Sequence, residues 1–240
     1  MSPIIYRFEV CANSVESCRT AQIGGAHRVE LCAGMPEGGT TPSYGEMVTA
    51  RELLTSTQLF VMIRPRGGDF FYSLLEQSIM LKDIENARQL GVDGVVFGCL
   101  TEHGDIDTLF LKQLMEASGD VPVTFHRAFD RCRHPQEALE QLIEAGVQRI
   151  LTSGGKPKAE EGIPLLKALQ QQAGDRIVLL AGSGVTETNI ARIARETGIH
   201  EFHFSAREEV SGRNVPPITT VRRVEATIAA LTSDLHRSTR

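Results

Sequence analysis

Two stretches near the start of the chain, FEVCA at residues 8–12 and VELCA at residues 29–33, share one pattern. In each, an acid, an aliphatic residue, a cysteine and an alanine follow one another. Because side chains alternate between the two faces of a β-strand, the glutamate and the cysteine of each stretch share a face, with Val10 and Leu31 on the opposite one. An unpaired carboxylate under a covering helix is costly, so we expect both acid-bearing faces to look into a common polar space.

Short apolar stretches alternate with helical segments along the rest of the chain. Stretches too short to be helices are predicted as strands, and they cover residues 8–12, 29–33, 59–63, 94–97, 123–126, 149–151, 177–181 and 201–204. Helices are expected from a cap at Asn13 or Ser14 to Gly24, then over residues 43–54, 73–90, 107–117 and 135–145, in a segment that ends near residue 173, and over residues 189–197 and 219–235.

Strands that alternate with helices favour parallel pairing through right-handed crossovers. Eight such units in a chain of about this length are typical of a (β/α)8 barrel. We therefore predict an α/β fold, a single TIM-like barrel domain over residues 1–240, with strand–helix units from about residue 4 to residue 235. A doubly wound open sheet is the alternative, but the even spacing of the units and the lack of a linker favour the barrel.

The composition is that of an ordinary globular protein, with 41% hydrophobic and 23% charged residues among 240. The net charge of -5 argues against a nucleic-acid partner, because phosphate binding needs a basic surface. No stretch approaches the roughly 20 apolar residues that span a bilayer, and no signal sequence opens the chain, so we expect no membrane partner and a cytoplasmic location. Five cysteines without a C-x-x-C pair indicate reduced thiols rather than disulfides or a zinc ribbon.

Polar residues leave several of the predicted strands, where barrel enzymes place their active sites. The candidates for catalysis are Glu9, Glu30, Arg64, Arg66, Asp69 and His126. Glu9 and Glu30, opposite His126, would exchange protons with a substrate, and the two arginines would orient an anionic substrate. The alternative is a buried salt-bridge network in which the glutamates pair with the arginines. No lysine lies at the inward end of a strand, which argues against Schiff-base chemistry, and no dinucleotide-binding glycine motif follows the first strand.

Small and hydroxyl-bearing residues follow the later strands, at Ser153, Gly154, Gly182, Ser183, Gly184 and Ser205. The G-S-G turn precedes a helix, and at this position in a barrel exposed backbone amides commonly bind a phosphate or a carboxylate. We predict an anion-binding site there. The alternative is a tight turn without a ligand.

Cys11 and Cys32 lie on adjacent predicted strands and have the same parity as the glutamates. Two thiolates that approach each other can hold a soft ion such as Cu(I). The alternative is that both behave as small hydrophobic residues in the core. His203 shares its strand face with Ser205 and is expected to line the barrel.

Several ordered motifs resemble the CutC family. They are RVELC at 28–32, EGGTTPS at 37–43, IRPRGGDF at 63–70, TFHRAFD at 124–130, LTSG at 151–154 and AGSGV at 181–185, and the match runs from about residue 8 to 206. The resemblance implies a cytosolic TIM-like barrel assigned to copper homeostasis, self-associating, with Cu(I) as its ligand. Residues 207–217 are expected to form a shorter loop than is usual in the family.

Three functions therefore stay open. The first is a copper-handling protein with Cys11 and Cys32 as Cu(I) ligands. The second is a barrel enzyme that performs acid/base chemistry on a small phosphorylated or carboxylated metabolite. The third is a scaffold or interaction protein without a ligand. A homo-oligomer is expected in each case.

Overall fold

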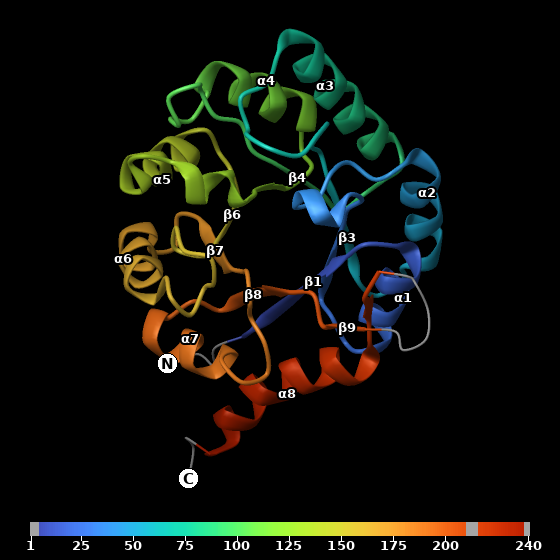
Figure 1. The fold of residues 1–240 in the computed structure, drawn as a ribbon, viewed down its shortest axis with the longest axis vertical. Coiled ribbons are helices and arrows are strands. Elements are labelled where there is room, and N and C mark those ends of the chain that lie inside the picture. The colour runs from blue at the N-terminus through green and yellow to red at the C-terminus, as the bar shows by residue number, and fades with distance from the viewer. Residues whose placement is uncertain (1–4, 210–215, 238–240) are drawn as a thin grey trace.

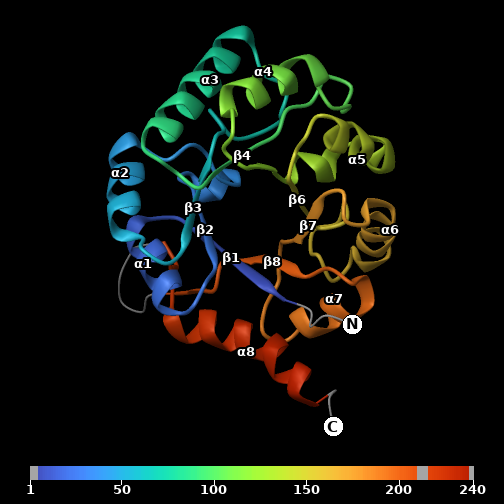
Figure 2. The same ribbon diagram turned by 180° about the vertical axis from the view of Figure 1, so that it is seen from behind.

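The fold is a closed barrel of eight parallel strands surrounded by helices (Figures 1 and 2). The computed structural model describes residues 5–209 and 216–237, with side chains up to residue 232. The strands are β1 (Arg7–Ala12), β2 (Arg28–Leu31), β3 (Gln58–Met62), β4 (Gly94–Phe97), β5 (Val123–Phe125), β6 (Arg149–Thr152), β7 (Val178–Ala181) and β8 (Glu201–Phe204). Because β8 pairs with β1, with Glu9 opposite His203, the sheet closes and the predicted barrel is confirmed.

One helix follows each strand and packs on the outside of the barrel (Figure 1). The helices are α1 (Val15–Ile23), α2 (Tyr44–Leu53), α3 (Leu74–Gln89), α4 (Thr108–Ser118), α5 (Pro135–Glu144), α6 (Ile163–Ala173), α7 (Ile190–Thr197) and α8 (Val221–Arg237). Serine caps define several starts, and Ser43 and Ser73 form capping boxes with Glu46 and Glu76. No helix in the described part of the chain is long and apolar enough to cross a membrane.

Shorter elements occupy the loops at the C-terminal ends of the strands. The 3-10 helices are η1 (Met35–Glu37) and η2 (Arg127–Arg131), and β9 (Arg207–Glu208) pairs with β10 (Ile218–Thr219). Most of the loop expected to be short, residues 207–217, lies outside the described residues. The second and fifth strands end earlier than predicted, because Cys32 already belongs to the following loop and His126 caps η2.

Strand alternation divides the side chains as the sequence pattern predicts. Val10 and Leu31 are fully buried in the main core, which includes the inward faces of the helices. Cys11 and Cys32 point the other way, into the barrel, where they pack in a second apolar cluster with Phe60. The register explains this grouping, since Cys11 lies beside Glu30 on the neighbouring strand.

Buried ion pairs fill the barrel beneath this cluster. Arg28 bonds to the carboxylate of Glu9 and to that of Glu201, at 2.7 Å for Glu201. Arg149 also contacts Glu201 at 2.7 Å. Both guanidinium groups lie over the ring of Phe60, at 5.0 and 5.6 Å from its centroid. We call these five residues the ion-pair floor, and it gives the site above it a closed, charged base.

Candidate functional site

A cavity of about 960 Å³ opens at the C-terminal ends of the strands. Its wall includes residues from both the early and the late strands, among them Cys11, Glu30, Cys32, Arg64, Asp69, His126, Ser183, Gly184, His203 and Ser205. This is the end of the barrel where active sites are found. Arg66, Ser153, Gly154 and Gly182 do not reach the cavity wall, and Glu9 lies below it in the ion-pair floor.

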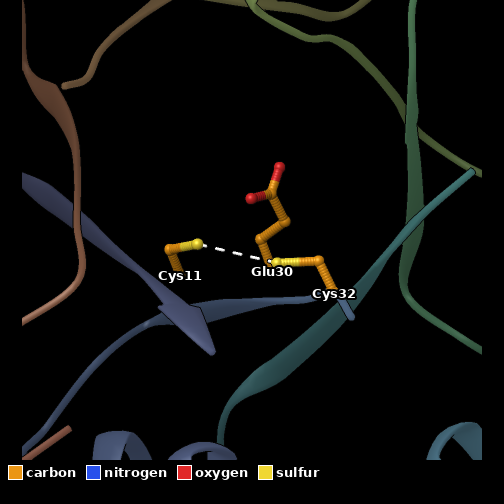
Figure 3. A group of neighbouring side chains, drawn as sticks. All are labelled: Cys11, Glu30 and Cys32. Atoms are coloured by element: carbon orange, nitrogen blue, oxygen red, sulfur yellow. Dashed lines mark hydrogen bonds between the residues drawn. The ribbon is translucent and has the colours of Figure 1, made fainter. Parts of the chain in front are cut away.

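Three sulfur atoms gather on one side of this cavity. The Sγ atoms of Cys11 and Cys32 are 3.7 Å apart, and the Sδ atom of Met35 lies 3.2 Å from Cys32 and 4.0 Å from Cys11. Figure 3 shows the two cysteines reaching toward each other, Cys11 from β1 and Cys32 from the first residue after β2, with the Glu30 carboxyl group extending into the barrel interior. We call Cys11, Cys32 and Met35 the sulfur cluster. It can hold a soft metal ion.

Met35 reaches the two cysteines because the chain turns back directly after β2. Gly34 adopts a left-handed conformation with φ of 56°, and η1 begins at the next residue. An added Cβ at Gly34 would also approach Thr40 at 2.6 Å. Glycine is therefore required both for the backbone angle and for the close approach of the returning strand.

A chain of titratable groups crosses the barrel next to the sulfur cluster. Nδ1 of His203 lies 2.6 Å from Oε1 of Glu9, and Nε2 lies 3.8 Å from Oε2 of Glu30. Burial alone would raise the pKa of Glu9, but the charges of Arg28 and His203 hold it well below its usual range. Burial opposes the charge on His203, yet Glu30 and Glu9 raise its pKa well above the ordinary value. The centre of the barrel thus holds an imidazolium between two carboxyl groups.

Two groups beside His203 favour their protonated forms. Burial raises the pKa of Glu30 well above its ordinary value. The hydrogen bond with Cys32, together with burial, raises the pKa of Cys11 in the same direction. Oε1 of Glu30 is buried and has no hydrogen-bond partner among the described residues. This side of the cavity therefore contains polar groups whose bonding capacity is unfilled.

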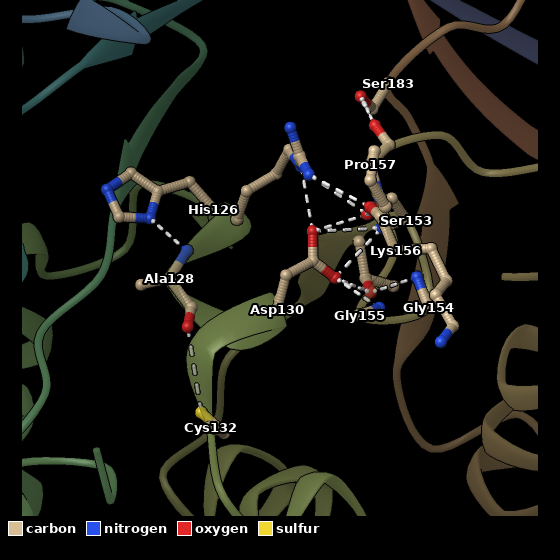
Figure 4. Close-up of polar contacts among 12 residues, drawn as sticks. His126, Ala128, Asp130, Cys132, Ser153, Gly154, Gly155, Lys156, Pro157 and Ser183 are labelled. Carbon is tan, nitrogen blue, oxygen red and sulfur yellow. Dashed lines mark hydrogen bonds and ion pairs between the residues drawn. The ribbon is translucent and has the colours of Figure 1, made fainter. Parts of the chain in front are cut away.

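Asp130 dominates the opposite side. Its oxygens accept from Thr152 Oγ1 at 2.6 Å, from the Ser153 amide at 3.0 Å and from the Gly155 amide at 3.0 Å. Figure 4 shows these contacts converging on one carboxylate, which Arg127 also contacts at 2.8 Å. The donors that the sequence offers to an external anion at Ser153 are therefore used within the protein. We call Asp130 with Thr152–Gly155 the serine turn.

The turn after β7 is arranged differently. Ser183 has a positive φ of 77°, and its hydroxyl donates to the Pro157 carbonyl at 2.6 Å. The Gly182 amide donates a hydrogen bond to the Thr152 carbonyl. The amides of Ser183 and Gly184 donate to no acceptor within the described residues, and both residues line the cavity. Anion binding at this turn stays a prediction, and Ser205 lies on the cavity wall beside it.

The contact partners of the glutamates differ from those that the sequence predicts. The histidine that contacts the glutamates is His203, whereas His126 packs against Phe70. The partner of Glu9 is Arg28 instead of the expected Arg64 or Arg66. The reason is topological, because Arg28 begins β2 and lies in the barrel, while Arg64 and Arg66 follow β3 in the loop.

Arg64, Arg66 and Asp69 make mainly loop contacts. Arg64 donates to the carbonyls of the loop after β2 and to Gly68. Arg66 forms ion pairs with Asp69 at 3.0 Å and with Glu76 at 2.6 Å, and its side chain is 37% exposed. Asp69 is 73% exposed. These contacts hold the loop between β3 and α3 over the cavity.

The sequence pattern does not indicate the roles of three residues of this site. Met35 could have been found from its spacing, three residues after Cys32 in a predicted loop. The strand parity of His203 predicts only that it lines the barrel, and its contacts with Glu9 and Glu30 appear only in the structure. Arg28 stands next to the VELCA stretch, but nothing in its neighbours indicates that two carboxylates from other strands converge on it.

The chain matches the model of the CutC family over residues 6–208. A CutC family protein from Bacteroides thetaiotaomicron is 71% identical over 205 residues, which are 85% of this chain and 82% of the relative. A human protein named copper homeostasis protein cutC homolog is 50% identical over 84% of this chain and 74% of its own length. The crystal structure of the putative copper homeostasis protein CutC from Streptococcus agalactiae superposes with a TM-score of 0.81, at 38% identity, over 84% of this chain and 99% of that one.

More distant structures share only the fold. Thiamine phosphate pyrophosphorylase from Pyrococcus furiosus superposes with a TM-score of 0.63 at 17% identity, over 96% of this chain and 97% of that one. At this identity the likeness gives the architecture of the barrel and nothing about its chemistry.

Proposed function

Because this chain belongs to the CutC family, we propose that it handles copper by binding Cu(I) in the sulfur cluster of Cys11, Cys32 and Met35. The names of the human and streptococcal relatives, which refer to copper homeostasis, support the choice of metal. The observation that carries the proposal is the convergence of three sulfur atoms, two of them thiols, on the wall of the cavity.

The dimensions of the sulfur cluster suit a three-coordinate ion. A point equidistant from the three sulfurs lies about 2.1 Å from each, near the ~2.3 Å of a metal–thiolate bond. Soft thiolate and thioether ligands select Cu(I) over harder ions. To bind an ion at this point, the three sulfur atoms need to move only slightly outward.

A second ligand set would bind a different metal. One oxygen of Glu30 and the sulfurs of Cys11 and Cys32 lie within 4.8 Å of one another. A carboxylate in place of the thioether suits zinc better than Cu(I). Met35, by contrast, completes a donor set of three sulfur atoms. The balance of donors therefore favours Cu(I).

The test is a competition between the protein and a chromophoric Cu(I) chelator under reducing conditions. Replacing Cys11 and Cys32 by serine is expected to weaken Cu(I) binding at least a hundredfold. The matched control replaces Cys99 and Cys132, which do not line the cavity, and should leave the affinity unchanged. Unchanged affinity in the Cys11→Ser/Cys32→Ser protein would exclude the sulfur cluster as the copper site.

We further propose a cytoplasmic location and self-association. The free thiols of the sulfur cluster suit a reducing compartment. Leu74 and Leu75 at the start of α3, and Leu109 on the neighbouring α4, are about four-fifths exposed and supply an apolar surface for a second copy. Light scattering on the purified protein measures the oligomer directly, and a purely monomeric protein at all concentrations would contradict self-association.

The cavity also supports a second function, acid/base catalysis on a small phosphorylated or carboxylated metabolite. The observation in its favour is the Glu30 carboxyl group, which has an unpartnered oxygen at the cavity and is linked through His203 to Glu9. Such an enzyme would exchange substrate C–H protons with solvent. NMR in D2O on a panel of small metabolites tests this, because Glu30→Gln should abolish any exchange that the wild-type protein shows. Exchange that persists in this variant would remove Glu30 from the chemistry.

A further inference from the structure

Two buried polar side chains on the cavity wall have hydrogen-bonding capacity that the protein does not use. They are Arg64, which follows β3, and His126, which follows β5. Their side chains are almost fully buried, at 4% and 3% exposed. Neither belongs to the sulfur cluster, and the copper proposal does not involve them.

The tautomer of His126 is fixed by its position at the start of η2. Its Nδ1 accepts a hydrogen bond from the Ala128 amide at 3.1 Å, so this nitrogen carries no proton (Figure 4). Burial and the charge of Arg64 lower the pKa of His126 to about 3, which keeps the ring neutral. The proton therefore resides on Nε2. Nε2 is a buried donor without an acceptor among the described residues.

Arg64 is a buried cation without a carboxylate partner in the described part of the chain. Its Nη1 donates to the Glu37 and Gly39 carbonyls, both at 2.9 Å, and Nη2 donates one N–H to Gly68 at 2.9 Å. One N–H of Nη2 remains. Nε is buried and has no hydrogen-bond partner among the described residues. The guanidinium is thus held firmly by neutral carbonyls, and its charge is not neutralised.

Phe70 joins these two groups. The Arg64 guanidinium lies over its ring at 4.8 Å from the centroid, and the His126 ring lies at 4.9 Å. Phe70 itself is half-buried and lines the cavity. One apolar ring therefore covers a neutral donor and an uncompensated cation at the same time.

The His126 ring is tightly packed in its position. A Cβ at Gly98 would overlap both the imidazole and the Ala128 side chain. The glycine after β4 thus makes room for the ring in this orientation. An unpaired donor in so constrained a place calls for an acceptor supplied from outside the chain.

We propose that His126 and Arg64 form a binding site for the carboxylate of a small metabolite. One carboxylate oxygen accepts from Nε2–H of His126 and the other from the remaining Nη2–H of Arg64, while Phe70 moves aside. A carboxylate fits because its single charge matches the single buried cation and its two oxygens match two donors. A phosphate dianion would need more donors than these side chains provide.

The role of His126 then differs from that expected for a proton carrier. A neutral imidazole that donates Nε2–H to an oxygen positions and polarises that oxygen, and it neither gives up nor takes a proton at physiological pH. The residue is a positioning donor for the ligand. This assignment holds whether the cavity serves copper handling, acid/base catalysis or both.

The experiment is NMR on protein labelled with 15N at histidine, titrated separately with acetate, glycolate and pyruvate, with chloride as the control for ionic strength. We expect the His126 Nε2-attached proton to be visible before titration and to move downfield saturably with at least one carboxylate. Chloride should not move it. If all three carboxylates leave this resonance in place, the proposal fails.

Two variants complete the test. His126→Phe removes the donor and should weaken binding of the responding carboxylate about tenfold or more. His126→Gln keeps an N–H donor near the position of Nε2 and should retain most of the affinity. Equal affinity in wild type and His126→Phe would overturn the assignment. Cu(I) affinity, measured in parallel, should be unchanged in both variants, which separates this proposal from the copper proposal.

Discussion

Two carboxyl groups belong to the wall of the cavity, and their surroundings are opposite in kind. Asp130, in the serine turn, accepts hydrogen bonds on both oxygens from hydroxyls, amides and Arg127. Glu30, beside the sulfur cluster, has one oxygen without a partner. The difference shows that burial of an acid has two uses. Asp130 completes the structure of a loop, whereas Glu30 leaves bonding capacity to something outside the chain.

The largest expected effect tests the structural role of Asp130. Asp130→Asn places an amide NH₂ against the amides of Ser153 and Gly155, which removes acceptors and creates repulsion. We expect a loss of about 3 kcal/mol in the free energy of unfolding. Urea denaturation followed by circular dichroism measures it.

The matched control is Asp69→Asn. Asp69 also pairs with an arginine three residues earlier, but its side chain is 73% exposed. This variant should change stability by less than about 0.5 kcal/mol. Equal losses in the two variants would mean that the serine turn does not depend on its buried carboxylate.

The next effect concerns pH and His126. Its pKa of about 3 in the folded protein is below the ordinary 6.5, so below pH 6.5 the unfolded chain binds a proton that the folded chain does not. Stability from this group is therefore complete above about pH 6.5 and falls as the pH decreases toward 3. Between pH 6.5 and 5 the loss should reach about 2 kcal/mol. Urea denaturation at several pH values, compared with His126→Phe, isolates the contribution, and parallel pH profiles would contradict it.

A smaller effect is expected at the sulfur cluster. Met35→Leu preserves the volume of the side chain but removes the thioether, which lies 3.2 Å from Cys32. Cu(I) affinity should fall about tenfold, and the free energy of unfolding should change by less than about 1 kcal/mol. Chelator competition measures the first and urea denaturation the second. An unaltered affinity would reduce the site to the two cysteines.

The smallest effect is expected at Glu30. Because burial raises its pKa, the carboxyl group resembles the neutral amide of glutamine. Glu30→Gln should therefore raise the free energy of unfolding at pH 7 slightly above that of wild type, because the wild-type carboxyl group ionises more readily in the unfolded chain than in the fold, whereas the amide does not ionise in either. Urea denaturation at pH 7 and at pH 5 gives the comparison. A loss as large as that of Asp130→Asn would mean that Glu30, too, is structural.

The strand pattern allowed the barrel to be predicted, because alternating burial and even spacing are local properties of the chain. Val10 and Cys11 went to opposite faces as their parity requires. The site was harder, since its residues meet only through closure of the sheet. His203 contacts Glu9 because β8 returns to β1, a pairing that joins residues 194 positions apart.

The glycine-rich turns illustrate the same limit. The T-S-G-G turn after β6 and the G-S-G turn after β7 read alike in the sequence as anion sites. Only the structure shows that Asp130, from the preceding loop, already accepts the hydrogen bonds of the amides in the first turn. Whether a turn is filled from within depends on a side chain elsewhere in the chain, which turn composition does not encode.

The ion-pair floor limits the routes by which a copper ion could reach and leave the sulfur cluster. Arg28, Glu9 and Phe60 are almost fully buried and fill the barrel beneath the sulfur cluster. A copper ion bound there would have to enter and depart on the same side. Donor and acceptor proteins would then compete for a single docking face and could not hand the ion through the barrel, so delivery and collection would be successive encounters.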